Sequence, residues 1–215
     1  MIKADLHIHT EYSMDCTTPL DKIVERCLEL KINCIAVADH GTIEGAVKLR
    51  EIAPFTVITA EEILTPDGEV MGMFLAESIR SGTSISEVIS EIRAQNGYIC
   101  IPHPFDIFRP SALGNKILDE IADQIDIIEV FNARTLPFQS HEKAISFAKK
   151  YGINMSAGSD AHTLQEIGNA YVEMPEFTSQ DDFFVSLSQV KINGRKTNPM
   201  IHFISLKNKI LKRLS

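Results

Sequence analysis

The sequence predicts an α/β fold in which short buried strands alternate with amphipathic helices to form a compact βα barrel. Apolar runs alternate with helical patterns along most of the chain, which is typical of parallel sheets and barrels. Seven or eight strand-like runs fit within about 190 residues, which is too many for a small sandwich. Histidines and carboxylates gather where several of these runs end, which is the edge where barrels carry their functional sites.

The expected strands are short apolar runs bounded by turn residues. They cover residues 2–8, 33–38, 55–60, 69–76, 98–101, 125–131, 153–157 and 170–174. Pro66-Asp67-Gly68 is expected to form a turn that joins the third and fourth runs into a hairpin.

Helices are expected where apolar residues recur at helical spacing behind a capping signal. They cover residues 20–28, 44–52, 85–92, 117–122, 140–151 and 179–190. Thr18-Pro19-Leu20-Asp21 and Ser84-Ile85-Ser86-Glu87 both resemble a capping box. Gly152 is expected to end the fifth helix.

The composition is that of one soluble globular domain. The 215 residues are 44% hydrophobic and 23% charged, which excludes disordered and fibrous chains. No apolar run approaches the roughly 18–20 residues that a membrane span needs, and the first ten residues lack a secretory signal. The four cysteines form no CxxC pair, so we expect reduced thiols in a cytoplasmic protein.

Charge divides the chain into a body at residues 1–190 and a basic tail at residues 191–215. The tail has seven basic and no acidic residues, and because the whole chain carries −8, the body carries −15. Such a body should repel nucleic acid unless cations neutralise it locally. We expect the tail to be a helix packed on the barrel, with contact to nucleic acid or an anionic membrane as alternatives.

The ends of the predicted strands carry five of the seven histidines. In the first strand, a period of two places Asp5, His7 and His9 on one face, and two imidazoles on one face can chelate a divalent metal. Burying such a cluster costs several kcal/mol per charge unless the charges are paired or bind a metal. The other strand-end groups are His40, Glu61, Glu62, His103, Glu129, Asn132, Asp160 and His162. This pattern predicts a metal site.

Four of these segments resemble the motifs of the PHP (polymerase and histidinol phosphatase) family, in the expected order. Asp5-Leu6-His7-Ile8-His9-Thr10, followed by Asp15, resembles the first motif. Ala38-Asp39-His40 resembles the second, Ile101-Pro102-His103-Pro104-Phe105 a later one, and Gly158-Ser159-Asp160-Ala161-His162 the last.

The resemblance implies a distorted (β/α)7 barrel that holds two or three divalent ions, namely Mn²⁺, Fe²⁺ or Zn²⁺, and hydrolyses phosphoesters. Glu62 matches the family's glutamate after the third strand, and Glu61 leaves that match open by one residue. The implied ligands are His7, His9, Glu62 and Asp160 for a first ion, Glu62 and His103 for a second, and Asp15, His40 and His162 for a third.

Two departures from the family pattern bear on the metals. Many relatives have a further histidine on the strand over residues 69–75, which here has none, so we expect a second ion that is weaker or more hydrated. Asp15 stands where some relatives have histidine, which favours Mn²⁺ or Fe²⁺ over Zn²⁺ at that position.

The residues and the resemblance together predict a metal-dependent phosphoesterase acting on a small phosphorylated substrate, either a phosphomonoester or a nucleotide. A metal-activated hydroxide would attack phosphorus. Arg109 and Arg134 are the expected catalytic arginines that bind the phosphate, the alternative for each being a surface salt bridge. We expect Asp5 and Asp39 to orient the metal-bound histidines, and His141 and His202 to lie outside the site.

Two alternatives belong to other functional classes. One is an exonuclease that acts on short oligonucleotides with the help of the basic tail. The other is a non-catalytic module whose metals stabilise the fold. Hydrolysis of a C–N bond at a similar centre is a weaker third alternative.

Overall fold

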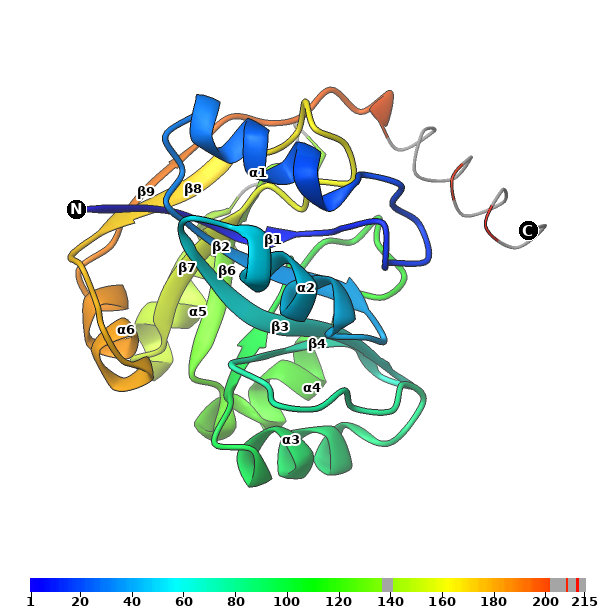
Figure 1. Cartoon of the computed structure of the whole chain (residues 1–215). Helices are drawn as coiled ribbons and strands as arrows, with labels where there is room; N and C mark the ends of the chain where they lie inside the picture. The colour runs from blue at the N-terminus through cyan, green and yellow to red at the C-terminus, as the bar shows by residue number, and fades with distance from the viewer. Residues whose placement is uncertain (137–140, 202–207, 209–211, 213–215) are drawn as a thin grey trace.

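The computed structural model describes residues 1–136, 141–201, 208 and 212, and its strands form one sheet that curves into a barrel (Figure 1). The strands are β1 (Ile2–Ile8), β2 (Cys34–His40), β3 (Thr56–Thr65), β4 (Gly68–Met73), β5 (Tyr98–Ile101), β6 (Ile127–Asn132), β7 (Asn154–Gly158), β8 (Ala170–Met174) and β9 (Lys191–Gly194). The helices are α1 (Leu20–Glu29), α2 (Glu44–Ile52), α3 (Ile85–Ala94), α4 (Asn115–Glu120), α5 (Glu142–Tyr151) and α6 (Gln180–Leu187), with a short 3-10 helix at Ala122–Gln124.

The sheet has the order β7-β6-β5-β4-β3-β2-β1-β8-β9. Strands β1 to β3 pair in parallel, β4 is antiparallel to both of its neighbours, and β5 to β7 pair in parallel again. A bridge between Ile8 and Ala161 brings the two ends of this arc together. The seven strands therefore nearly close, which confirms the expected distorted (β/α)7 barrel, and β8 and β9 extend the sheet beyond β1.

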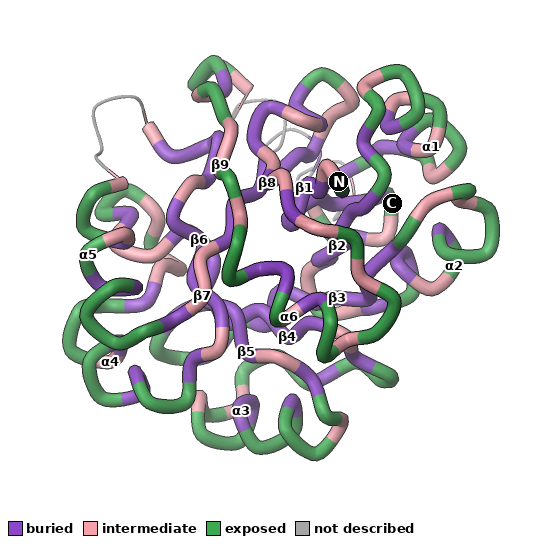
Figure 2. The backbone as a smooth tube through the Cα atoms, turned by 90° about the vertical axis from the view of Figure 1, so that its left-hand side faces the viewer, coloured by how far each residue is buried: buried purple, intermediate pink, exposed green. Residues whose placement is uncertain are grey.

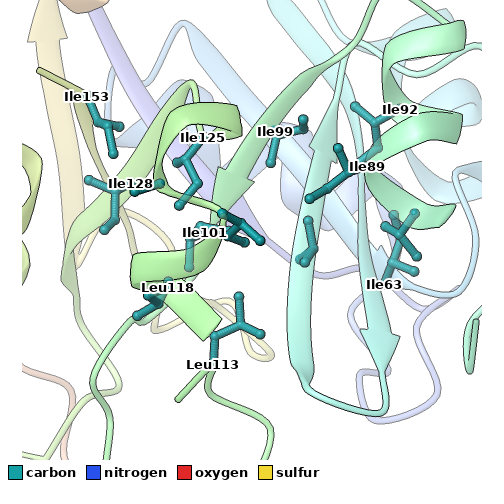
Figure 3. Close-up of a cluster of buried hydrophobic side chains, with 14 of the residues drawn as sticks. Ile63, Ile89, Ile92, Ile99, Ile101, Leu113, Leu118, Ile125, Ile128 and Ile153 are labelled. Atoms are coloured by element: carbon teal, nitrogen blue, oxygen red, sulfur yellow. The ribbon is translucent and has the colours of Figure 1, made fainter. Parts of the chain in front are cut away.

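Figure 2 shows the buried strands surrounded by helices whose outer faces are exposed. Isoleucines from the sheet and from α3 pack in the layer outside β4 to β6, where Figure 3 shows Ile63, Ile92 and Ile128 among the buried side chains. A second apolar cluster contains small residues such as Ala36 and Ala60 together with Phe183 of α6. These two clusters hold the strands in place, so the side chains at the strand ends are supported by a rigid frame.

One of the two expected capping boxes is wrong. Ser84 accepts from the Glu87 amide while Glu87 accepts from the Ser84 amide, so this box is complete. The N-cap of α1 is Pro19, which has no side-chain acceptor, and the Leu20 amide donates instead to Glu11 Oε1 at 3.4 Å. The Thr18 hydroxyl instead donates to the His162 carbonyl at 3.2 Å, because the tertiary structure brings the segment after β7 against it. Gly152 ends α5 in the left-handed conformation, as expected.

The basic tail departs from the expected helix at its start. Lys191–Gly194 form β9, which pairs antiparallel with β8, so these four residues belong to the sheet. Most of the remaining tail, including His202, lies outside the described residues, as does Ser140 at the expected start of the fifth helix. Within the part of the chain that the structure describes, no helix is both long enough and apolar enough to cross a membrane.

Candidate metal centre

Five histidines meet inside one end of the barrel. They come from β1 (His7), the residue after it (His9), the end of β2 (His40), and the loops after β5 (His103) and β7 (His162). The ring centroids of neighbouring imidazoles lie between 4.1 and 6.0 Å apart for His9–His162, His9–His40, His7–His9 and His7–His103. If these rings were protonated they would repel one another at this distance, so nearby carboxylates or a bound cation would stabilise the cluster.

A β-bulge in β1 turns His7 and His9 toward the barrel interior. Asp5 pairs with Ile35 of β2, but the register then shifts before Ile8 pairs with Val37. Asp5 therefore points to the outer side of the sheet, and the expectation that it shares a face with His7 and His9 is wrong. The alternation of a regular strand could not reveal this, because the extra residue appears only when the strand pairs.

The first candidate metal position lies between His7 of β1 and His9, which follows that strand. Their Nε2 atoms are 3.2 Å apart, and Glu62 Oε2 lies 3.5 Å from each of them. Asp160 Oδ1 completes the position at 3.3 Å from His9 Nε2 and 3.8 Å from His7 Nε2. All four side chains are buried. These four are the residues that the family resemblance implies for a first ion, and the structure brings them together.

A second position contains a carboxylate that the sequence analysis missed. Glu62 Oε1 lies 2.7 Å from His103 Nε2, as expected for a shared pair of ligands. Glu69 Oε2 lies 3.5 Å from the same His103 nitrogen, and Glu69 Oε1 lies 3.9 Å from His40 Nδ1. The site lies at the carboxyl ends of the parallel strands, and because β4 is antiparallel to both neighbours, its amino end reaches the same edge. The predicted hairpin was the signal that could have revealed Glu69.

The third position lies nearest the protein surface. Asp15 Oδ2 lies 3.5 Å from His40 Nε2 and 3.2 Å from His162 Nε2. Together with His9, these side chains each offer a ligand atom, and the atoms lie within 4.8 Å of one another. The structure thus brings together all eight predicted metal-binding residues.

The donor set fits divalent cations. Within the described part of the chain, Glu62 Oε2, Glu69 Oε2 and Asp160 Oδ1 are buried and accept no hydrogen bond. A buried carboxylate oxygen without a partner is costly, and a bound cation removes that cost. His103 and Asp160 also have positive φ angles of 30° and 54°, a strained backbone that is typical of functional sites.

Glu129 of β6 positions His7 and His103 through contacts to His7 Nδ1 and to the His103 amide. Its Oε1 lies 3.1 Å from His7 Nδ1, and its Oε2 accepts the His103 amide at 2.6 Å and the Asn132 side-chain amide at 2.9 Å. A carboxylate at Nδ1 holds that nitrogen protonated and leaves Nε2 free for a metal. Gly158 is required beside this contact, because a Cβ there would lie 2.2 Å from the His7 Cβ.

Asp5 and Asp39 do not orient the imidazoles as expected. Asp5 accepts from the Ser159 amide at 2.9 Å and the Ser159 hydroxyl at 2.6 Å. Asp39 accepts from the Thr10 amide and hydroxyl, both at 2.6 Å. Each aspartate therefore anchors the loop segment that carries the ligands, while Glu129 makes the contact to His7.

Burial and neighbouring charges shift the pKa values of the side chains in the centre. Burial and, to a smaller extent, the neighbouring imidazole of His162 together lower the pKa of His9 to about 4, which favours its neutral form. Burial also opposes protonation of His7, but Glu129 and Asp160 outweigh it and raise the pKa of His7. Burial raises the pKa of Asp160, but Arg109 and His7 lower it well below its usual range. The centre therefore holds ionised carboxylates that attract positive charge.

A pocket of about 440 Å³ opens above the centre and receives both predicted arginines. Arg109 Nη2 lies 2.7 Å from Asp160 Oδ2. Arg134 is buried, lies 3.4 Å from Glu166 Oε1 and contacts His162 Nδ1. Neither is an exposed surface salt bridge, so both guanidinium groups lie where an anion in the pocket would meet them.

The structure decides between Glu61 and Glu62 and places His141, as expected, outside the centre. Glu61 faces away and accepts the Ile79 amide at 2.8 Å, so Glu62 is the glutamate of β3 that enters the centre. His141 stacks on Phe131 at a centroid distance of 4.2 Å. The four cysteines are buried free thiols.

The barrel and its His-carboxylate centre are those of the PHP family, to which the chain belongs. The PHP domain model matches residues 5–60, and a PHP-associated model matches residues 138–191. An uncharacterized protein of Methanocaldococcus jannaschii is 33% identical over 199 residues, which cover 88% of this chain and 80% of the relative. A second uncharacterized protein of that organism is 36% identical over 145 residues, covering 61% and 82%.

Solved structures show the same fold at low sequence identity. A two-domain protein of Bacteroides vulgatus that contains a predicted PHP-like metal-dependent phosphoesterase matches with a TM-score of 0.73 and 16% identity, covering 96% of this chain and 69% of that one. An amidohydrolase from Chromobacterium violaceum, solved with sulfate and no metal, matches with a TM-score of 0.64 and 13% identity, covering 95% and 96%.

Proposed function

We propose that this protein is a metal-dependent phosphoesterase that hydrolyses a small phosphomonoester at a centre of two or three divalent ions. The observation that carries the proposal is that three overlapping groups of imidazole and carboxylate ligands lie directly below a pocket that two arginines enter. Membership of the PHP family and the likeness to a PHP-like metal-dependent phosphoesterase support it.

The ligand assignments are part of this proposal. His7, His9, Glu62 and Asp160 would hold a first ion, and Glu62, His103 and Glu69 would hold a second. Asp15, His40 and His162 would hold a third ion. Bound divalent ions would lower the pKa of water from about 15.7 toward 7 and so supply hydroxide at neutral pH.

The chain's own residues position the substrate. Arg109 and Arg134 bind the phosphate oxygens and offset the negative charge that grows as phosphorus is attacked. Glu62 and Asp160 place a carboxylate oxygen 3.5 Å and 3.3 Å from His9 Nε2, and so hold the ligands of the first ion close together. Glu129 keeps His7 in the orientation and tautomer that ligation needs. Burial of the floor excludes bulk water, which strengthens each of these electrostatic contacts.

The test is a substrate panel with protein purified without chelator and loaded separately with Mn²⁺, Fe²⁺ or Zn²⁺. The panel contains phosphomonoesters, phosphodiesters, short oligonucleotides and amides, the last because one structural neighbour is an amidohydrolase. We expect metal-dependent release of phosphate from at least one monoester. Turnover of amides alone, or of oligonucleotides alone, would contradict the proposal, as would a fully loaded protein that hydrolyses nothing in the panel.

A further inference from the structure

We propose that Glu166 is a positioning residue that allows a divalent ion to bind at His162 beside a buried guanidinium group, because its carboxylate offsets the positive charge of Arg134. The inference rests on the proposed function, because it concerns the third ion that Asp15, His40 and His162 would hold there. It comes from a buried carboxylate behind the ligands, which the sequence analysis did not single out.

A permanent positive charge lies next to the third metal position. Arg134 Nη1 contacts His162 Nδ1 and lies 3.4 Å from the Asp160 carbonyl oxygen. His162 Nε2, on the opposite side of the same ring, faces Asp15 Oδ2 at 3.2 Å. Arginine stays protonated in proteins, so an ion bound at Nε2 would meet the repulsion of a guanidinium group across one imidazole ring.

Glu166 contacts both the guanidinium group and the backbone of the ligand. Its Oε1 lies 3.4 Å from Arg134 Nε. Its Oε2 accepts the His162 amide at 3.0 Å and the Thr163 hydroxyl at 3.1 Å. Glu166 is 1% exposed and Arg134 is 5% exposed, so water and salt screen their charges only weakly. The carboxylate therefore lowers the positive potential that Arg134 creates at His162.

Hydrogen bonds hold the two loops that carry these charges in a fixed arrangement. The Asn169 amide donates to the Glu166 carbonyl at 2.9 Å, and the Asn169 side-chain amide donates to Thr197 Oγ1 at 3.0 Å. The Thr197 amide donates to the carbonyl of Ala133 at 2.8 Å, and Ala133 directly precedes Arg134. Thr197, which follows β9, thus links the loop after β7 to the loop after β6, so the carboxylate and the guanidinium group stay together.

The neighbouring Asp160 carboxylate does not take over this role. Its Oδ2 lies 2.7 Å from Arg109 Nη2, and its Oδ1 lies 3.3 Å from His9 Nε2, among the ligands of the first position. The charge of Asp160 therefore serves Arg109 and a first ion, whereas the Glu166 carboxylate faces Arg134.

The experiment measures Mn²⁺ binding to the metal-free full chain by isothermal titration calorimetry. The third ion is identified as the binding step that Asp15→Asn weakens or removes, because Asp15 occurs in only one of the three ligand groups of the described residues. We expect Glu166→Gln to weaken this step at least about tenfold. The glutamine oxygen can still accept the His162 amide and the Thr163 hydroxyl, so the variant removes the charge and keeps these contacts.

A double variant separates an effect of charge from an effect of structure. Arg134→Gln should strengthen the third step, because the repelling charge is gone. Arg134→Gln combined with Glu166→Gln should return this step to within about threefold of the wild-type affinity, because both charges are then absent. If Glu166 merely supported the loop, removal of the Arg134 charge would not restore the affinity.

Thr163→Val is the matched control. It removes a hydroxyl that donates to the same carboxylate but keeps both charges, so the third step should be unchanged. Far-ultraviolet circular dichroism checks the fold of each variant. If Glu166→Gln does not fold, Arg134→Gln alone must still strengthen the third step, and a weaker or unchanged step in that variant would overturn the inference.

An unchanged third step in folded Glu166→Gln, or a loss that persists in the double variant, would overturn this inference and leave the proposed function intact. A wild type without any step that Asp15→Asn alters would also overturn this inference alone, because the substrate panel tests hydrolysis independently. If the wild-type protein binds no Mn²⁺, Fe²⁺ or Zn²⁺ at all, the proposed function fails and this inference fails with it.

Discussion

The carboxylate of Glu69 lies 3.5 Å from the imidazole Nε2 of His103, on the strand where no metal ligand was expected. Both side chains are buried, and Glu62 lies between them and the rest of the centre, 2.7 Å from the same His103 nitrogen. At this position Glu62 and Glu69 supply oxygen ligands and His103 supplies nitrogen. Relatives that have a histidine on this strand would instead offer one glutamate and two histidines, so the position here is richer in oxygen. Oxygen-rich sites favour hard ions such as Mn²⁺.

Replacing Glu69 should therefore weaken one ion without dismantling the others. We expect Glu69→Gln to lower the number of tightly bound Mn²⁺ ions by one per chain, measured by elemental analysis after gel filtration. Glu69→His should keep the ion count and shift the preference toward Zn²⁺. Glu61→Gln is the control, because this neighbouring buried glutamate faces away from the centre. An unchanged Mn²⁺ count and affinity in Glu69→Gln would show that Glu69 is not a ligand.

Glu129 should act through the histidines that it holds. We expect Glu129→Gln to weaken metal binding by about 10- to 100-fold, because the carboxylate that fixes the orientation of His7 is lost. Isothermal titration calorimetry, in which Mn²⁺ is added to the metal-free protein, measures this affinity directly. Asn132→Ala removes a side chain that donates to Glu129 at 2.9 Å and should have a smaller effect. Full metal affinity in Glu129→Gln would contradict the role given to Glu129.

His7→Ala should abolish hydrolysis while the barrel still folds. The variant removes a ligand of the first ion, and we expect a loss of activity of at least about 100-fold. His141→Ala should keep full activity, because His141 stacks on Phe131 outside the centre. Far-ultraviolet circular dichroism checks that both variants fold. Substantial turnover by folded His7→Ala protein would mean that the first ion is placed wrongly.

Metal removal should destabilise the protein. Ions that bind only the folded state add about 2.7 kcal/mol at 100 times their Kd, which for a chain of this size corresponds to roughly 5–10 °C in Tm. We expect at least two ions per chain after reconstitution, and a chelator should lower Tm by about this amount. Added KCl at matched ionic strength is the control. Fewer than one ion per chain, or a Tm that does not change when the chelator is added, would argue against a metal centre.

The cysteine thiols should be unreactive in the folded protein. Burial raises the pKa of Cys16 to about 11 and that of Cys27 to about 12, and Cys34 and Cys100 are also buried. Since the thiolate is the reactive form and burial blocks access, Ellman's reagent at pH 8 should label none of them quickly. Four thiols should react in denaturant. Rapid labelling of a native thiol would show that its segment opens.

The positions of β1 to β8 were predictable because buried strands leave apolar runs whose ends are marked by turns, whereas β9 is short and lies in the basic tail. The Ser84 cap was predictable for the same kind of reason, since its partner Glu87 is three residues away. The capping box predicted at Thr18 is wrong because the Thr18 hydroxyl donates to the carbonyl of His162, which is 144 residues away in the sequence. A capping pattern in the sequence identifies only hydrogen-bond partners that are a few residues away. A partner that is distant in the sequence can take the same hydrogen bond, and the local sequence does not reveal it.

The amino-acid sequence by itself predicted a metal site, because five histidines and several carboxylates fall at strand ends. The resemblance of its motifs to the PHP family then implied which eight residues would bind the metals. Only the tertiary structure decided how the ligands share positions. The bulge in β1 separates Asp5 from His7 and His9, and the reversed direction of β4 brings Glu69 beside His103. The bulge depends on strand pairing, because the register of a strand is set by its neighbours in the sheet. The predicted hairpin already implied the direction of β4, but the approach of Glu69 to His103 also depends on the pairing of β4 with β5.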